Sequence, residues 1–208
     1  RMRITVTGSQ THGAVPWKGV DPIAISSQII TALQTIVARE VNITQVPAVV
    51  TIGSIHGGVR NNIIPEEVVM EGTIRTFNDE VRKDIHDSIR KKAEMIASAS
   101  GATAKVEIFS DIAKVTFNEP SLTDKMVPSL ERVYGKENVK ITPFITGAED
   151  FPFFTDHAPG LYFFNGVAPD PSKAAPNHSP YFFADERNLK YGTKALTQLA
   201  VDYLYLYK

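Results

Sequence analysis

The sequence predicts a mixed α/β protein in two parts: a ferredoxin-like β-α-β-β-α-β unit over residues 1–113, then part of a larger α/β unit over residues 114–208. In the first part, strand-like alternation and helix-like periodicity follow one another in that order. The second part offers two helical stretches and only short strand-like segments, too few to cover the faces of a sheet. A length of 208 residues allows one domain or two.

The first unit opens with a strand and a helix. RITVTGS (residues 3–9) alternates with a period of two, which is typical of a strand. Residues 21–40 predict a helix, because Asp21 suits the N-cap and Pro22 suits the first helical position. The apolar face of this helix comprises Ile25, Ile29, Leu33 and Ile36.

Two strands, a helix and a last strand complete the first unit. AVVTIGSIHGG (48–58) and EEVVMEGTIRTF (66–77) are predicted strands joined by VRNNIIP. A helix is expected over residues 78–100, with Gly101 at its C-terminal end. TAKVEIFS (103–110) is the final strand. The apolar stripe of the helix comprises Val81, Ile85, Ile89 and Ile96.

The second part reads as incomplete. A helix over residues 122–134 contains Pro128, which should kink or break it. Short strands are expected at VKITPF (139–144) and GLYFFNGV (160–167), which would leave a sheet edge unpaired. A final helix is expected from about Glu186, with an inward face of Leu189, Leu196, Leu199, Ala200 and Tyr203.

Composition excludes several classes of function. A net charge of −1 gives no overall field for nucleic acid or an anionic membrane. The sequence has no cysteine, so it holds no disulfide framework and no thiol nucleophile. That composition suits a reducing compartment, and we expect a cytoplasmic protein. No apolar run approaches the roughly 20 residues of a membrane span.

Two of the five histidines stand in unusual contexts. His178 lies between two prolines in PNHSP, which narrow the backbone choices of its neighbours. Imidazole is a ligand for zinc, manganese or cobalt, but one histidine is not a metal site. His12 lies in a Gly/Pro-punctuated turn, where a side chain can be presented to a ligand. His86 is predicted to face solvent, and His157 fits loop packing equally well.

Three other positions offer polar chemistry, each with a structural alternative. Asn62 lies in the connection between the middle strands and could serve turn geometry alone. Arg75 lies near a strand end, where a guanidinium either aids solubility or binds a substrate carboxylate. Glu149 and Asp150, in TGAEDFPFF, suit a metal or substrate contact or the N-terminus of a helix.

Five stretches together resemble the metal-dependent aminoacylase/carboxypeptidase family. Within that family they are most similar to the N-acyl-amino-acid amidohydrolases, such as hippurate hydrolase and indole-acetyl-amino-acid hydrolases. They occur in the family's order: THGAVPWKGVDPI, GSIHGGVRNNIIPEE, GTIRTF, GAEDFPFF and PNHSPYF. The resemblance implies a lid, or dimerisation, domain over residues 1–113 and the C-terminal part of a zinc-peptidase-like catalytic domain over residues 114–208.

The same resemblance implies a role for each candidate residue. His178 would be a ligand in a site for two divalent metal ions, Zn, Mn or Co. His12 would reach across a homodimer and polarise the scissile carbonyl in the partner's site. Asn62 and Arg75 would hold the free carboxylate of the substrate, and Glu149 would line the pocket.

The implied activity is hydrolysis of an amide bond in N-acyl amino acids or small peptides by metal-activated water. The remaining metal ligands and the general base would come from a region preceding residue 1, and Glu66 and Glu67 belong to the lid motif instead. Two alternatives stay open. One is a non-catalytic dimerisation or binding module, and the other is a dipeptidase or an acyl-diaminopimelate-type deacylase of the same family.

Overall fold

The computed structural model describes residues 1–109 and 114–206. The chain divides into two compact units, Arg1–Val115 (unit 1) and Thr116–Lys208 (unit 2). The expected domain boundary at residue 113 and the end of the predicted strand at Ser110 lie outside the described residues. Among the described helices, none is both long enough and apolar enough to cross a membrane.

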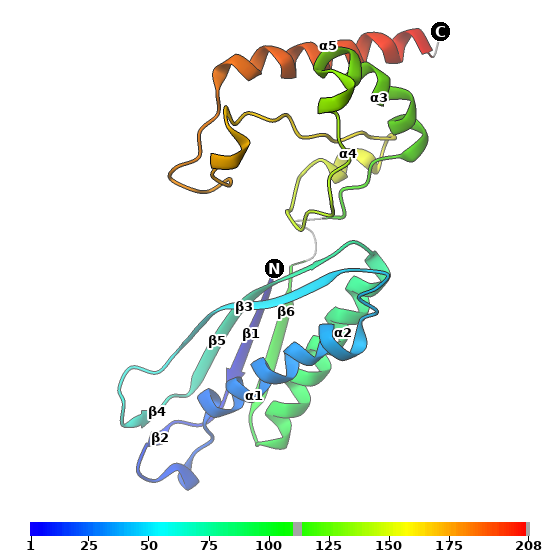
Figure 1. Ribbon diagram of the computed structural model, residues 1–208. Coiled ribbons are helices and arrows are strands. Elements are labelled where there is room, and N and C mark those ends of the chain that lie inside the picture. Colours follow the sequence, from blue (N-terminus) through cyan, green and yellow to red (C-terminus); the bar gives the residue numbers. More distant parts are fainter. Residues whose placement is uncertain (110–113, 207–208) are drawn as a thin grey trace. The chain divides into compact units, whose positions relative to one another are not determined.

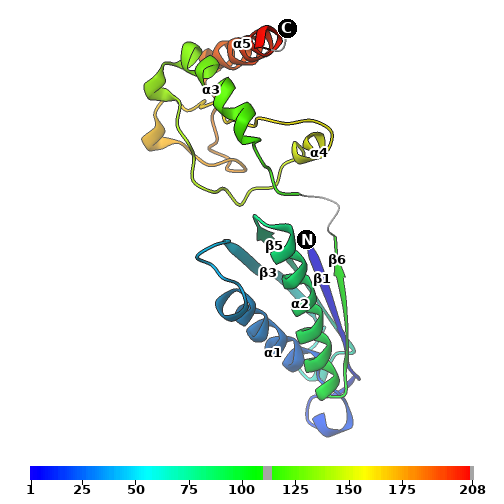
Figure 2. The same cartoon turned by 90° about the vertical axis from the view of Figure 1, so that its right-hand side faces the viewer.

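Unit 1 has the predicted ferredoxin-like topology. Its four strands form an antiparallel sheet in the order β3-β5-β1-β6, and two helices cover one face of that sheet (Figure 1, Figure 2). The strands are β1 (Met2–Thr7), β3 (Ala48–Gly57), β5 (Glu67–Thr76) and β6 (Thr103–Ile108), and the helices are α1 (Pro22–Thr35) and α2 (Asp79–Ala99). Every regular element predicted for this unit is present.

The core of unit 1 lies between the sheet and its two helices. Met2, Ile4 and Val6 alternate along β1 and are fully buried, because their side chains point towards the helices. Both predicted helix stripes pack against this face. The buried apolar helix residues include Ile25, Ile29, Leu33, Ile36, Ile85, Ile89, Ala93 and Ala97.

The ends of α1 follow local sequence signals. The carboxylate of Asp21 accepts hydrogen bonds from the backbone N–H groups of Ile23 and Ala24, which confirms Asp21 as the N-cap. The predicted helix continues to residue 40, but its last turn, η2 (Ile36–Glu40), is wound as a π-helix. A side-chain network from Glu40 to α2 holds this turn, with Ser88 Oγ 2.7 Å and Lys92 Nζ 2.9 Å away.

Unit 2 is built from helices and loops. Its regular elements are α3 (Pro120–Tyr134), α4 (Pro152–Thr155), α5 (Leu189–Leu206) and the short 3-10 turns η3 (Lys136–Asn138), η4 (Pro171–Lys173) and η5 (Glu186–Asn188). The expectation that Pro128 could break the helix is wrong, since α3 continues through it. Burial of Met126, Leu130 and Val133 on one face of α3 offsets the single lost backbone hydrogen bond.

The two strands predicted in unit 2 are not formed in its described residues. VKITPF and GLYFFNGV run without a neighbouring strand, and a strand needs one to pair its backbone groups. In GLYFFNGV, a side chain forms hydrogen bonds with the backbone in place of a neighbouring strand. The Asn118 amide donates to the Tyr162 carbonyl at 2.8 Å and accepts from the Tyr162 N–H at 2.7 Å. Further backbone bonds go to loops, from Glu119 N–H to Gly160 O and from Asp185 N–H to Val167 O.

The predicted inward face of α5 is mostly wrong. Leu189 and Leu196 are 61% and 63% exposed, and Ala200 and Tyr203 are also exposed. Only Leu199 packs as expected, in a small cluster around the buried Ala195 that includes Leu130 and Val133 of α3. Within unit 2, α5 therefore contacts α3 along a narrow stripe that is centred on Ala195.

We expect Ile89→Ala to lower the free energy of unfolding of unit 1 by about 2–4 kcal/mol, because it opens a cavity beneath α2. Met95→Ala, on the same helix at a position that is 61% exposed, should change it by less than about 0.5 kcal/mol. Urea unfolding of the 208-residue chain, monitored through hydrogen exchange of the β1 amides, measures both changes in the free energy of unfolding. Equal effects of the two substitutions would contradict the assignment of the core.

Candidate functional site

Unit 1 brings His12 and Asn62 together in a small ribbon that the sequence did not predict. Strand β2 (Thr11–His12) pairs with β4 (Ile63–Ile64), and His12 lies opposite Ile63. The Gly13 N–H donates to the Asn62 carbonyl at 2.8 Å, so the two candidate residues are neighbours at the ribbon's end. Figure 1 shows this ribbon at the opposite end of unit 1 from the N-terminus.

The backbone fixes the tautomer of the His12 imidazole. The Ala14 N–H donates to His12 Nδ1 at 3.0 Å, so Nδ1 is an acceptor and carries no proton. In the neutral ring the proton is then on Nε2. The His12 side chain is exposed, so it presents a fixed N–H donor that could stabilise negative charge developing on a bound carbonyl oxygen.

Arg75 lies at the other end of the same sheet. It pairs with Val49 near the end of β5, whereas Glu67 at the start of β5 pairs with Thr7, close to the ribbon. Arg75 follows Glu67 by eight residues, which at roughly 3.4 Å per residue is about 27 Å. One copy of unit 1 therefore does not bring Arg75 together with His12 and Asn62.

A cluster of ion pairs lies on the strand that carries Arg75. The guanidinium groups of Arg1 and Arg3 converge on the Glu71 carboxylate at 3.0 and 2.8 Å, and their hydrogen bonds hold the pKa of that carboxyl below its usual value. Glu71 lies four residues before Arg75 on β5, so this ion-paired cluster is at the middle of the strand.

In unit 2, Glu149 lies beside an aromatic cluster. The Tyr162 ring lies 5.2 Å from the Phe151 ring and 5.3 Å from the Phe164 ring. Burial, and then the Glu149 carboxylate, raise the pKa of the Tyr162 phenol. Tyr162 is a residue that sequence reasoning missed; the aromatic run LYFF was the available signal, but it was interpreted as a strand. Asp150 is exposed, and its side chain does not cap α4.

His178 has a backbone conformation that non-glycine residues rarely adopt. It is the one described non-glycine residue with a positive φ, +68°. It occupies the third position of a turn closed by the Ser179 N–H donating to the Pro176 carbonyl at 3.2 Å. Its side chain is exposed and, among the described residues, has no hydrogen-bond partner. Such local strain is typical of functional positions.

The described residues do not complete a metal centre. They contain no group of three or more His, Cys, Asp or Glu side chains placed to hold an ion. His178 offers one suitable nitrogen, but a zinc site needs at least three protein ligands. The described residues can therefore contribute one ligand to a metal site, but they do not form such a site by themselves.

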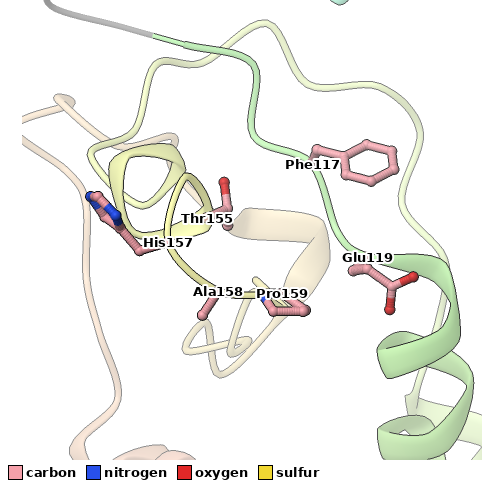
Figure 3. Close-up of a pocket in the computed structure, with 7 residues that line it drawn as sticks. Phe117, Glu119, Thr155, His157, Ala158 and Pro159 are labelled. Atoms are coloured by element: carbon pink, nitrogen blue, oxygen red, sulfur yellow. The ribbon is translucent and has the colours of Figure 1, made fainter.

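A cavity of about 400 Å³ in unit 2 lies apart from the candidate residues. Its lining includes Phe117, Glu119, Thr155 and His157. The polar groups do not converge, since the imidazole of His157 and the carboxylate of Glu119 point away from one another (Figure 3). Hydrogen bonds from Leu122 and Ser121 lower the pKa of the Glu119 carboxyl, which caps α3 and is a poor general base.

Comparison with known proteins places these features in a family. Residues 1–100 match the family described as "Peptidase dimerisation domain". The chain is 38% identical over 202 residues to thermostable carboxypeptidase 2 of Saccharolobus solfataricus, covering 97% of this chain and 50% of that protein. It is 36% identical to an N-acetyl-L-cysteine deacetylase of Bacillus subtilis, covering 89% of this chain and 43% of that protein.

A solved structure agrees with these relatives. The chain superposes with a TM-score of 0.69 and 27% identity on a dinuclear metal binding peptidase from the M20 family of Bacillus subtilis, covering 98% of this chain and 50% of that one. Unit 1 thus contains a peptidase dimerisation domain. The chain belongs to the M20 family, whose matched members are carboxypeptidases, deacetylases and amidohydrolases. It spans about half the length of the curated relatives that it matches.

We expect Glu149→Gln to lower the pKa of Tyr162 towards its ordinary value, because a carboxylate opposes formation of the phenolate. The pKa should stay raised in part, since burial is the larger cause. Carbon NMR titration of ring-labelled tyrosine measures it, with Tyr162→Phe to assign the signal. An unchanged midpoint would show that the carboxylate does not act on this phenol.

Proposed function

We propose that the protein acts as a homodimeric hydrolase that cleaves the amide bond of N-acyl amino acids or small peptides. The observation that carries this proposal is the placement of His12 and Asn62 at one end of the unit 1 sheet and of Arg75 at the other. A substrate that uses an oxyanion donor and a carboxylate-binding arginine must then draw them from two subunits.

An exposed edge strand of the sheet offers a surface for the dimer contact. β3 is an edge strand of ten residues and carries the exposed apolar side chains Val49 and Ile55. Unprotected edges of this length pair readily with another strand. The other edge, β6, has six residues and exposes Thr103 and Lys105. We therefore assign the dimer contact to β3.

Antiparallel pairing of two β3 strands would bring the separated groups to one end. Each β3 runs from its Ala48 end, beside Arg75, to its Gly57 end, near the ribbon. In an antiparallel pair, the Gly57 end of one copy lies next to the Ala48 end of the other. The β5 strand of one subunit then lies two strand spacings, about 10 Å, from the β3 strand of the other. His12 of one subunit thus approaches the Arg75 end of the other.

Each residue then has a chemical role. The Nε2–H of His12 donates to the carbonyl oxygen of the scissile amide as negative charge develops there. Arg75 of the other subunit binds the free carboxylate with its planar guanidinium. Asn62, which the resemblance assigned to the substrate carboxylate together with Arg75, is instead a neighbour of His12 through its backbone carbonyl and would add an amide donor at that end of the substrate. Glu149, with Tyr162 beside it, would line the substrate pocket, which is distinct from the cavity at Phe117.

Divalent metal ions complete the proposal. When bound, they would supply the activated water of amide hydrolysis. His178 would give one ligand from its exposed turn, and the identity of the ions, Zn, Mn or Co, is left to measurement. The kinship with a dinuclear metal binding peptidase supports this assignment.

The substrate class is tested by assaying the whole enzyme with N-acyl amino acids and with dipeptides, with and without Mn, Zn or Co. The named relatives include both a carboxypeptidase and a deacetylase, so both substrate types belong in the assay. If no substrate releases an amino acid under any metal condition, the hydrolase proposal fails. The alternative, a non-catalytic dimerisation module, would then be favoured. It is motivated by the lack of a three-ligand group in the described residues.

In the whole enzyme, we expect His12→Ala to lower kcat about 10²–10³-fold, because it removes one oxyanion donor, while bound metal stays unchanged. His12→Gln, which keeps an N–H donor, should recover part of the rate. His178→Ala should instead lower the metal content, as elemental analysis of the purified proteins measures. Unchanged turnover in His12→Ala would remove the cross-subunit role.

The dimer contact is tested in the 208-residue chain by sedimentation. We expect the double substitution Val49→Lys and Ile55→Lys to yield monomers at concentrations where the wild type is a dimer, because paired edges would juxtapose like charges. Thr103→Lys on the β6 edge is the matched control and should remain dimeric. A monomeric wild type, or a dimer that the β3 changes leave intact, would contradict the assignment to β3.

A further inference from the structure

Trp17 stands out on the surface of unit 1. It is the only tryptophan in the sequence, and its side chain is 76% exposed. It lies on the 3-10 turn η1 (Pro16–Lys18), five residues after His12. A single exposed apolar side chain is common on a protein surface, so what singles Trp17 out is its position on the loop that carries His12.

The backbone that carries Trp17 is held rigidly to the His12 ribbon. The Val15 N–H donates to the His12 carbonyl at 2.9 Å, and the Lys18 N–H donates to the Val15 carbonyl at 3.0 Å. Pro16 opens the turn. At Gly19 an added Cβ would lie 2.5 Å from the Ser9 carbonyl oxygen, so the turn packs closely on the chain that precedes it. Trp17 and His12 are therefore presented together, as parts of one fixed loop.

The adjoining tip of unit 1 is also apolar and exposed. Val59, between β3 and β4, is 95% exposed and follows Gly58, whose φ is +79°. It precedes Asn62 by three residues, and the Ile63 N–H donates to the Arg60 carbonyl at 3.3 Å to close that turn. Each of the two polar candidate residues thus has an exposed apolar side chain close by in the sequence.

We propose that Trp17 is a specificity-determining residue that contacts the acyl substituent of the substrate, and that it favours aromatic or long apolar acyl groups over acetyl. This inference rests on the proposed function. In an N-acyl amino acid the carbonyl stands between the free carboxylate and the acyl substituent. With the carboxylate at Arg75 and the carbonyl at His12, the substituent extends towards the loop that carries His12.

The test compares kcat/KM for N-benzoyl and N-acetyl derivatives of one amino acid in the whole enzyme. Trp17→Ala should lower kcat/KM for the benzoyl substrate at least about tenfold, chiefly through KM, and change the acetyl value by no more than about twofold. Trp17→Phe should restore most of the benzoyl preference. Met95→Ala, an exposed apolar side chain on the outer face of α2, is the control and should leave both values unchanged.

The other outcomes separate this inference from the proposed function. A wild-type enzyme that hydrolyses both substrates, with a benzoyl-to-acetyl ratio that Trp17→Ala leaves intact, overturns the role of Trp17 and keeps the hydrolase. Loss of the dimer in Trp17→Ala, seen by sedimentation, also overturns it and assigns Trp17 to the subunit contact. A wild-type enzyme inactive on every acyl substrate contradicts both.

Discussion

The register of β1 between β5 and β6 is the constraint on which the rest of unit 1 depends. It places Met2, Ile4 and Val6 beneath both helices, and a slip of one residue would turn all three to the uncovered face. The ribbon that carries His12 begins four residues after β1 ends. The same pairing therefore sets the hydrophobic core and the position of the candidate site.

That register also places Arg75 and His12 at opposite ends of the sheet. The guanidinium groups of Arg1 and Arg3 bind the Glu71 carboxylate on the strand that carries Arg75, and the ribbon end presents the His12 imidazole with its Nδ1 held by the Ala14 N–H. The proposed function assigns Arg75 and His12 to the carboxylate and the carbonyl of one substrate. Because the antiparallel sheet is stiff, the separation cannot be closed within one copy of unit 1. An edge strand long enough to pair offers a way to close it between copies.

In unit 2, the structure likewise depends on which segments lie next to one another. Its strand-like segments remain unpaired by any strand in the described part of the chain, and the Asn118 amide satisfies part of the backbone instead. The left-handed turn at His178 and the aromatic cluster beside Glu149 are formed locally, by short turns and ring contacts. Local order at these positions does not require a complete sheet, which is why both features are present.

The sequence by itself determined the order of elements in unit 1, the N-cap at Asp21 and both buried helix stripes, because period and capping are local properties. It also singled out the candidate site residues, including His12 and His178. Only the tertiary structure decided that Asn62 is a neighbour of His12 and that Arg75 is not, that Pro128 is tolerated, and that most of the α5 face predicted to point inward is exposed. Each of these depends on which distant segments pack together, and no local pattern encodes that.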